Sequence, residues 1–265
     1  MNGGQAPVEL LFLWHHHQPD YRRSADGRAR LPWVRLHATK DYLDMALRLE
    51  RHPSLRATFN LVPSLVDQIE DAVAGVPDDL FEALARPVAA LEGRARAEVI
   101  RRCRMLPPHA RERWPRLREL VDATRDPASV DHARLAALEA WFLLAWLDPM
   151  FLGEPEAVAA LAAPRPGERH RDALLALHAR LTAEVLPAYR RLAEKGQIEL
   201  STSPYYHPIL PLIVDSRCAQ RARPDLVAPF EPFVAPEDAR LQVRGAMERH
   251  ARVFGAPPAG MWPSE

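Results

Sequence analysis

Three histidines stand in a row near the start of the chain, directly after a short apolar run. The run covers residues 8–14, and His15, His16 and His17 follow it. An almost unbroken apolar run of this length is typical of a strand buried on both faces of a parallel sheet. Because side chains alternate along a strand, His15 and His17 would point to one side and His16 to the other. Two imidazoles on one side could bind a metal ion or hydrogen-bond sugar hydroxyls; histidines bonded to backbone at a strand end are the plainer alternative.

A second group of polar and aromatic side chains follows the strand-like segment 197–202. Tyr205 and His207 lie in this group, in a loop with prolines on both sides. Proline fixes its own φ and restricts the residue before it, so the loop should have a defined shape. An aromatic face can stack on the apolar face of a sugar ring, while histidine can donate or accept hydrogen bonds around it. Glu199, within the segment, is either a site carboxylate or a strand residue paired with a neighbour.

A third polar segment, 260–265, closes the sequence. It contains Trp262, ends on Glu265 and begins like a further strand. Parallel α/β folds place their active residues at the carboxyl ends of the strands, where all three groups are expected to lie. Taken alone, a terminal glutamate is normally a solvated chain end.

The elements that would position these groups alternate between strands and helices. A helical pattern fills residues 38–51, a strand-like run covers 55–62, and another helix starts near Pro63. This order is typical of a βα-repeating fold. Residues 77–195 are instead rich in Ala, Leu, Arg and Glu at helical spacing, which predicts a helical insertion packed beside the βα domain. A helix over 236–254 then precedes the last segment.

The composition is that of a folded globular chain. Of the 265 residues, 48% are hydrophobic, and the formal net charge is zero, which argues against nucleic-acid or membrane partners held by charge. The two cysteines, Cys103 and Cys218, lack the spacing of a zinc site or a disulfide scaffold. The amino-terminal segment resembles neither a signal peptide nor a membrane span, so we expect a cytoplasmic protein. The sequence predicts no oligomeric state.

In their order along the chain, the three groups resemble the first three conserved regions of glycoside hydrolase family 57. The first region of that family has an HxHQP-like pattern, which residues 15–19 match as His-His-His-Gln-Pro. Its second region is similar to residues 196–199 and the stretch after them, and its third to residues 262–265. Residues 31–37 and 58–65 also resemble the family, especially its amylase and amylopullulanase-like members. The resemblance covers essentially the whole chain.

The resemblance implies an α/β fold, an incomplete (β/α)7-type barrel with a helical insertion, truncated at the strand that carries the nucleophile. Residues 1–265 would then be part of a catalytic domain acting on α-glucan or maltooligosaccharide, with no cofactor and no metal. Glu265 would be the catalytic nucleophile. The segment here reads Trp-Pro-Ser-Glu rather than the common Trp-Leu-Pro-Glu, so this assignment depends on the Trp-to-Glu spacing. The implied substrate-binding residues are His15, His17, Gln18, Trp33, His37, Tyr205, His207 and Trp262.

The family is also a retaining one, and retaining glycosidases need two carboxyl groups roughly 5–5.5 Å apart. One attacks the anomeric carbon, and the other serves as acid and then as base. In the family the acid/base aspartate comes from the fourth and fifth regions, which would follow residue 265. We therefore expect no turnover by this chain alone and activity on α-glucans for the full-length protein.

Three other functions stay open. A transglycosylase, either a branching enzyme or a 4-α-glucanotransferase, would share this site, and the sequence separates neither it from a hydrolase nor α-1,4 from α-1,6 preference. A metal-dependent polysaccharide deacetylase would bind its metal through His15 and His17 with a nearby aspartate. No acidic residue stands immediately before these histidines, however, and Glu265 would have no role. A non-catalytic glucan-binding remnant is the third alternative.

Overall fold

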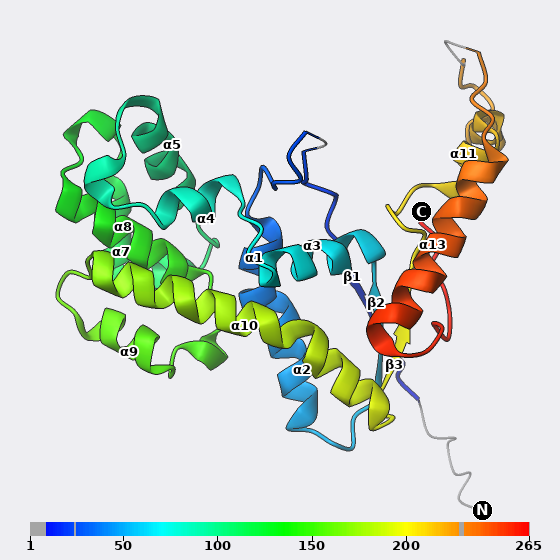
Figure 1. Cartoon of the computed structure of the whole chain (residues 1–265), viewed down its shortest axis with the longest axis horizontal. Helices are drawn as coiled ribbons and strands as arrows, with labels where there is room; N and C mark the ends of the chain where they lie inside the picture. Colours follow the sequence, from blue (N-terminus) through cyan, green and yellow to red (C-terminus); the bar gives the residue numbers. More distant parts are fainter. Residues whose placement is uncertain (1–8, 24, 228–230, 265) are drawn as a thin grey trace, which may run out of the picture. The chain divides into compact units, whose positions relative to one another are not determined.

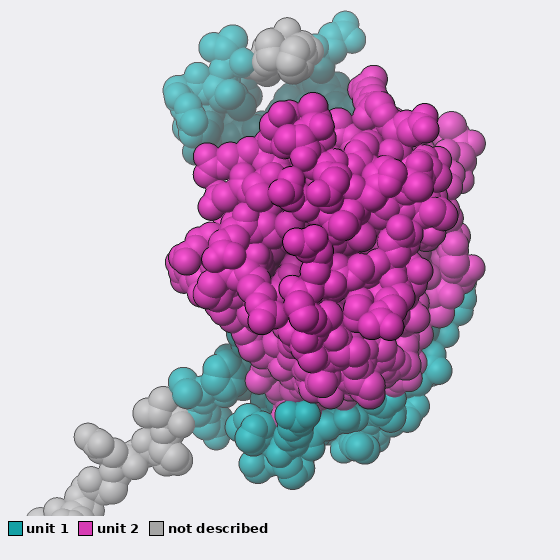
Figure 2. Space-filling view, turned by 90° about the vertical axis from the view of Figure 1, so that its left-hand side faces the viewer, with its two compact units in different colours: residues 1–19, 49–66, 189–265 teal, residues 20–48, 67–188 magenta. Residues whose placement is uncertain are grey.

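The computed structural model describes residues 9–23, 25–227 and 231–264 (Figure 1). The chain divides into two compact units, coloured separately in Figure 2. Unit 1 combines residues 1–19, 49–66 and 189–265, and unit 2 combines residues 20–48 and 67–188. Each unit is described below by itself.

Unit 1 contains a sheet of parallel strands in the order β1-β2-β3 (Figure 1). The strands are β1 (Leu13–His16), β2 (Ala57–Leu61) and β3 (Ile198–Ser201). Their register aligns His15 with Asn60 and Asn60 with Ser201, so these three residues form one row across the sheet. Neighbouring residues of a row point to the same face, and this face therefore carries polar side chains at its carboxyl end.

The opposite face of the sheet is apolar and packs against the end of α10 (Glu168–Glu194). Phe59 and Leu61 of β2 are 1% and 2% exposed. The ring of Tyr189, on α10, contacts Phe59 edge-on, with ring centroids 5.1 Å apart. His16 points to this face, where its Nε2 lies 2.9 Å from the hydroxyl oxygen of Tyr189. His16 is thus a buried core histidine, whereas His15 lies on the polar face of the sheet and is only half-buried.

A further segment continues the sheet beyond β3. Thr202 and Met261 form a parallel bridge. The N–H of Thr202 donates to the carbonyl of Gly260 at 3.1 Å, and the N–H of Trp262 donates to the carbonyl of Thr202 at 2.7 Å. Residues 260–262 therefore occupy the place of the next parallel strand, to which the described residues attach them by this single bridge.

The remaining helices of unit 1 follow β3. The last of them, α13, begins with proline, which suits the first helical position, and carries two acidic residues in its first turn. It ends at Gly255, whose φ of 80° is the left-handed conformation that glycine adopts readily after a helix. These elements are α11 (Leu210–Val214), η5 (Ser216–Cys218), α12 (Ala219–Ala222) and α13 (Pro236–Phe254).

Unit 2 is helical around α8, whose central residues are buried on all sides. Every residue from Leu135 to Ala145 is buried, as expected for a helix surrounded by others. Three helices, α2, α3 and α10, have one end in each unit by sequence. The elements are α1 (Trp33–His37), η1 (Ala38–Tyr42), α2 (Leu43–Glu50), α3 (Pro63–Val73), α4 (Asp79–Leu84), η2 (Val88–Ala90), α5 (Gly93–Cys103), α6 (Ala110–Arg113), α7 (Pro115–Ala123), η3 (Pro127–Ser129), α8 (His132–Ala145), η4 (Pro149–Phe151), α9 (Pro155–Ala162) and α10.

Buried polar side chains inside unit 2 include Glu139 and His178. Glu139 is fully buried and forms an ion pair with Arg171, 2.8 Å between Oε2 and Nη1. His178 is also buried; its Nε2 donates to the carbonyl of Leu143 at 3.0 Å, and the hydroxyl of Thr39 lies 3.0 Å from its Nδ1. Both side chains are therefore held by partners within the unit.

The predicted α/β fold with parallel strands is confirmed, and its strand order is that of consecutive strands in a barrel. The first strand differs from the prediction: it covers Leu13–His16 rather than residues 8–14, so His15 and His16 lie in the strand and not after it. Among the described residues the reason is its partner, since β2 begins only at Ala57 and the N–H of Thr58 pairs with the carbonyl of Phe12. Within the described part of the chain, no helix is both long enough and apolar enough to cross a bilayer.

Candidate functional site

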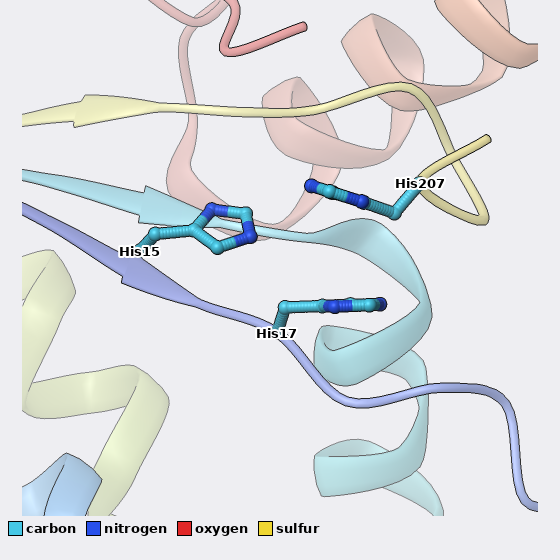
Figure 3. A group of neighbouring side chains, drawn as sticks. All are labelled: His15, His17 and His207. Atoms are coloured by element: carbon cyan, nitrogen blue, oxygen red, sulfur yellow. The ribbon is translucent and has the colours of Figure 1, made fainter. Parts of the chain in front are cut away.

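Three imidazoles from two segments meet at the carboxyl end of the sheet (Figure 3). His15 is part of β1, His17 follows that strand, and His207 lies in the loop after β3. The ring of His207 is stacked on that of His17, with centroids 4.4 Å apart, and lies 4.7 Å from that of His15. The alternation of side chains in β1 explains why His15 and His17 take part and His16 does not.

A buried amide fixes the orientation of His15. Asn60, fully buried on β2, accepts at its Oδ1 a hydrogen bond from His15 Nδ1 at 2.7 Å and another from the Ser203 hydroxyl at 3.0 Å. Its Nδ2 donates to the hydroxyl of Ser201 at 3.2 Å. An amide oxygen can only accept, so the proton of His15 is on Nδ1. In the neutral ring, Nε2 is then the nitrogen that can accept a hydrogen bond or bind a metal ion.

His207 has a strained backbone. Its φ is 55°, in the left-handed region, which it alone adopts among the non-glycine residues that the structure describes. This conformation costs a residue with a Cβ about 1–2 kcal/mol. The N–H of His207 closes a turn by donating to the carbonyl of Pro204 at 2.8 Å. Strain of this kind persists only where the surroundings impose it, and it is concentrated at functional sites.

Two helices, α3 and α13, hold the residues that precede His207. The N–H of Tyr205 donates to the carbonyl of Gln242 on α13 at 3.1 Å, and the carbonyl of Tyr205 accepts from the N–H of Ser64 on α3 at 3.1 Å. The N–H of Tyr206 donates to the side-chain oxygen of Gln242 at 2.9 Å. A Cβ on Gly245 would lie 3.1 Å from Cδ2 of the Tyr205 ring, so glycine permits this close approach.

Trp262 joins the cluster from the segment that continues the sheet. Its ring centroid lies 6.1 Å from that of His15, and the side chain is 39% exposed. The hydrogen bond from its N–H to Thr202 fixes its height along the sheet. Glu265, three residues further on, lies outside the described residues.

The other predicted site residues have different surroundings. The ring of Tyr205 contacts Tyr206, with centroids 5.0 Å apart, and its backbone holds the loop. The carbonyl of Gln18 accepts from the hydroxyl of Ser64 at 3.3 Å. Trp33 and His37 belong to unit 2, where both rings contact Trp146, at 5.7 and 5.6 Å. His37 Nδ1 also lies 2.6 Å from Asp41 Oδ2.

Of the two alternatives for Glu199, a site carboxylate or a strand residue paired with a neighbour, the structure supports the second. Glu199 is exposed on β3, aligned with Thr58 of β2, whose hydroxyl donates to Glu199 Oε2 at 3.3 Å. It is a strand residue paired with its neighbour.

Sequence reasoning missed the buried polar residues behind His15. Asn60, Ser201 and Ser203 form one hydrogen-bonded group across β2 and β3. The available signal was the amide at position 60 inside the otherwise apolar stretch Phe-Asn-Leu-Val. A buried amide needs several hydrogen-bond partners, so an asparagine in such a stretch indicates a group of polar side chains around it.

The arrangement offers two kinds of chemistry. Imidazole nitrogens that converge beside an exposed indole can hydrogen-bond a polyol while the indole face covers its C–H groups. The same nitrogens can bind a transition-metal ion, since each of the three histidines offers a ligand atom and these atoms all lie within 4.8 Å of one another.

Comparison with known proteins identifies the sequence class. The model of a family described as glycosyl hydrolase family 57 matches residues 11–265. No curated protein matches the chain significantly.

Three solved structures are similar over 96% of the chain. They are a branching enzyme of this family from Thermococcus kodakaraensis (15% identity, TM-score 0.43), the α-amylase AmyC from Thermotoga maritima (14%, 0.42) and a branching enzyme from Pyrococcus horikoshii (17%, 0.41). The chain spans only 32%, 35% and 34% of their respective lengths.

Proposed function

The chain belongs to glycosyl hydrolase family 57, and on that premise we propose that it forms part of a retaining enzyme acting on α-glucans. In this proposal the histidine cluster binds the sugar at which the reaction takes place. The observation that carries it is the convergence of His15, His17, His207 and Trp262 from three separate segments at one end of the parallel strands.

The sugar-binding role follows from the chemistry of these side chains. His15, with its proton on Nδ1, would accept a hydrogen bond from a sugar hydroxyl at Nε2. His17 and His207 would bind neighbouring hydroxyls. Trp262, partly exposed beside His15, would cover the apolar face of the ring. Gln18, Trp33, His37 and Tyr205 remain candidates for further sugar contacts.

Glu265 is the proposed nucleophile. Trp262 lies beside the cluster, and Glu265 follows it by three residues in the sequence. The Glu265 carboxylate would attack the anomeric carbon and displace the leaving oxygen, which a carboxylic acid protonates. Water then cleaves the glycosyl-enzyme with the same group as base. We leave that acid/base group unassigned.

The test uses the full-length enzyme with maltoheptaose as substrate. Glu265→Ala should abolish hydrolysis, and added azide should restore cleavage by attacking from the face that the carboxylate used, giving a β-glycosyl azide. NMR of the products of the unchanged enzyme should show the α-anomer first, and their chain lengths separate hydrolysis from glucan transfer.

Glu199→Gln is the matched control, because Glu199 is an exposed strand carboxylate paired with Thr58. It should retain ordinary activity. Undiminished turnover in Glu265→Ala, or a first product of inverted configuration, would overturn the proposal.

A further inference from the structure

The histidine cluster also has the composition and spacing of a metal site. One nitrogen each of His15, His17 and His207 lies within 4.8 Å of the others (Figure 3). Zinc binds histidine nitrogen at about 2.0–2.1 Å in tetrahedral geometry, which sets two ligand nitrogens roughly 3.3–3.4 Å apart. The nitrogens would therefore have to approach by at most about 1.5 Å, a distance that side-chain rotation supplies.

His15 already has the environment of a metal ligand. A histidine that binds a metal almost always donates its other ring N–H to an oxygen, which fixes both the tautomer and the ring orientation. His15 donates Nδ1–H to the buried Asn60 oxygen, which Ser203 also holds. One ligand is thus preorganised, with Nε2 as its ligating atom.

The other two ligands can adjust. His17 lies after β1 and His207 in a turn, both outside regular elements and both half-buried. Their rings are 19° from parallel in the stack, so binding to one ion requires them to tilt toward His15. Three imidazoles with a remaining open position suit zinc, copper or nickel rather than magnesium or calcium, which prefer oxygen ligands.

We propose that His15, His17 and His207 bind one divalent transition-metal ion, with Zn²⁺ as the reference ion, and that this ion and a glucan exclude each other. The mutual exclusion rests on the proposed sugar-binding function, since the same nitrogens would bind the metal ion and the sugar. The sequence had suggested His15 and His17 alone as a metal pair, with an aspartate as partner. It is the loop after β3 that supplies the third ligand, and this ligand is an imidazole.

The experiment titrates the metal-free protein with Zn²⁺ alone by calorimetry and records the visible spectrum with Co²⁺. We expect one equivalent bound, with tetrahedral Co²⁺ bands. His207→Gly deletes a ligand while relieving the left-handed backbone, so it should stay folded and weaken binding by more than the about 10–100-fold that loss of an outer-shell partner costs. His17→Ala should weaken Zn²⁺ binding in the same way.

The controls are His109→Ala and His132→Ala, which remove exposed histidines of unit 2 and should leave the stoichiometry unchanged. No binding, or binding that survives both His17→Ala and His207→Gly, would overturn the metal site. Competition between Zn²⁺ and maltoheptaose tests the mutual exclusion separately. Zn²⁺ that binds without displacing the sugar would refute the mutual exclusion and the shared position, but not the metal site. If the unchanged protein binds no Zn²⁺ and His207→Gly nevertheless loses its sugar affinity, the metal site is refuted and the sugar site is not.

Discussion

Nδ1 of His15 lies 2.7 Å from Oδ1 of Asn60, the residue aligned with it across the β1–β2 ladder. A side chain at the exposed end of one strand is therefore oriented by a fully buried amide of the next. Since that amide oxygen accepts two hydrogen bonds and the amide nitrogen donates a third, Asn60 cannot change without affecting several groups. The sugar and the metal ion proposed to bind at the cluster both depend on Nε2 of His15, which this contact leaves without the proton.

Asn60→Ala should lower the free energy of unfolding and release His15. The Nδ1–H of His15 and the hydroxyl of Ser203 would lose their acceptor, and a buried unsatisfied group costs about 1–3 kcal/mol. Urea unfolding measures the loss, and ¹⁵N NMR of the imidazoles should show a mixture of tautomers at His15. Thr58→Ala, on the same face of the same strand, is the control and should cost no more than about 1 kcal/mol. Equal stability of the two variants would contradict this role of Asn60.

His207→Gly should stabilise the fold while it abolishes ligand binding. Glycine adopts a φ of 55° without the penalty of about 1–2 kcal/mol, although it loses about 0.5–1 kcal/mol through its greater freedom in the unfolded chain. Thermal unfolding should thus show a net gain of up to about 1.5 kcal/mol. His207→Ala should lose binding without any gain in stability. A glycine variant less stable than the alanine variant would show that the turn is not strained.

Gly245→Val should impair sugar binding although the residue is not in the cluster. A Cβ at this position would lie 3.1 Å from the Tyr205 ring, and the Tyr205 backbone holds the turn that carries His207. We expect a weaker maltooligosaccharide affinity with little change in helix content. Adding Tyr205→Ala makes room for the valine, so the double variant should lose less affinity than the sum of the losses in the two single variants, a non-additive effect. Strict additivity in calorimetric titrations would argue against this coupling.

The pH dependence of stability should come from two opposing groups in unit 2. Burial raises the pKa of Glu139 to about 7, against the lowering effect of Arg171. Between its ordinary value of 4.5 and about 7 the folded state holds the extra proton, so stability falls as pH rises. Burial lowers the pKa of His178 from 6.5 to about 4, so the unfolded state holds the extra proton there and stability rises with pH.

Each effect is on the order of 3 kcal/mol, and the two largely cancel in the unchanged protein. Glu139→Gln removes the falling contribution, so its free energy of unfolding should rise more steeply from pH 4 to 6.5 than that of the parent. His178→Gln should show the reverse. Urea unfolding across this range provides the measurement, and parallel curves for all three proteins would refute the assignment.

The sequence predicted those features that depend on local pattern. Alternation along a strand correctly separated His15 and His17 from His16, and the proline-bordered loop does have a defined shape. The order of the three strand-end groups also indicated the family. In contrast, the length of β1 could not be predicted from its own residues, because β2 determines where pairing begins.

The contacts between distant residues were beyond the sequence. Asn60 lies 45 positions from His15, and only the register of the two strands brings them together. The turn that carries His207 is held at Tyr205 by Gln242 and Ser64, residues that no local pattern connects to it. The roles of Glu265 and of the sugar-binding residues remain predictions.

The fit between Gly245 and the ring of Tyr205 has a consequence for how this protein can diverge. A larger residue at position 245 crowds an aromatic ring at position 205, whereas a small residue at position 205 removes the need for glycine on the helix. Substitutions at these two positions should therefore be inherited as pairs among descendants that keep the histidine.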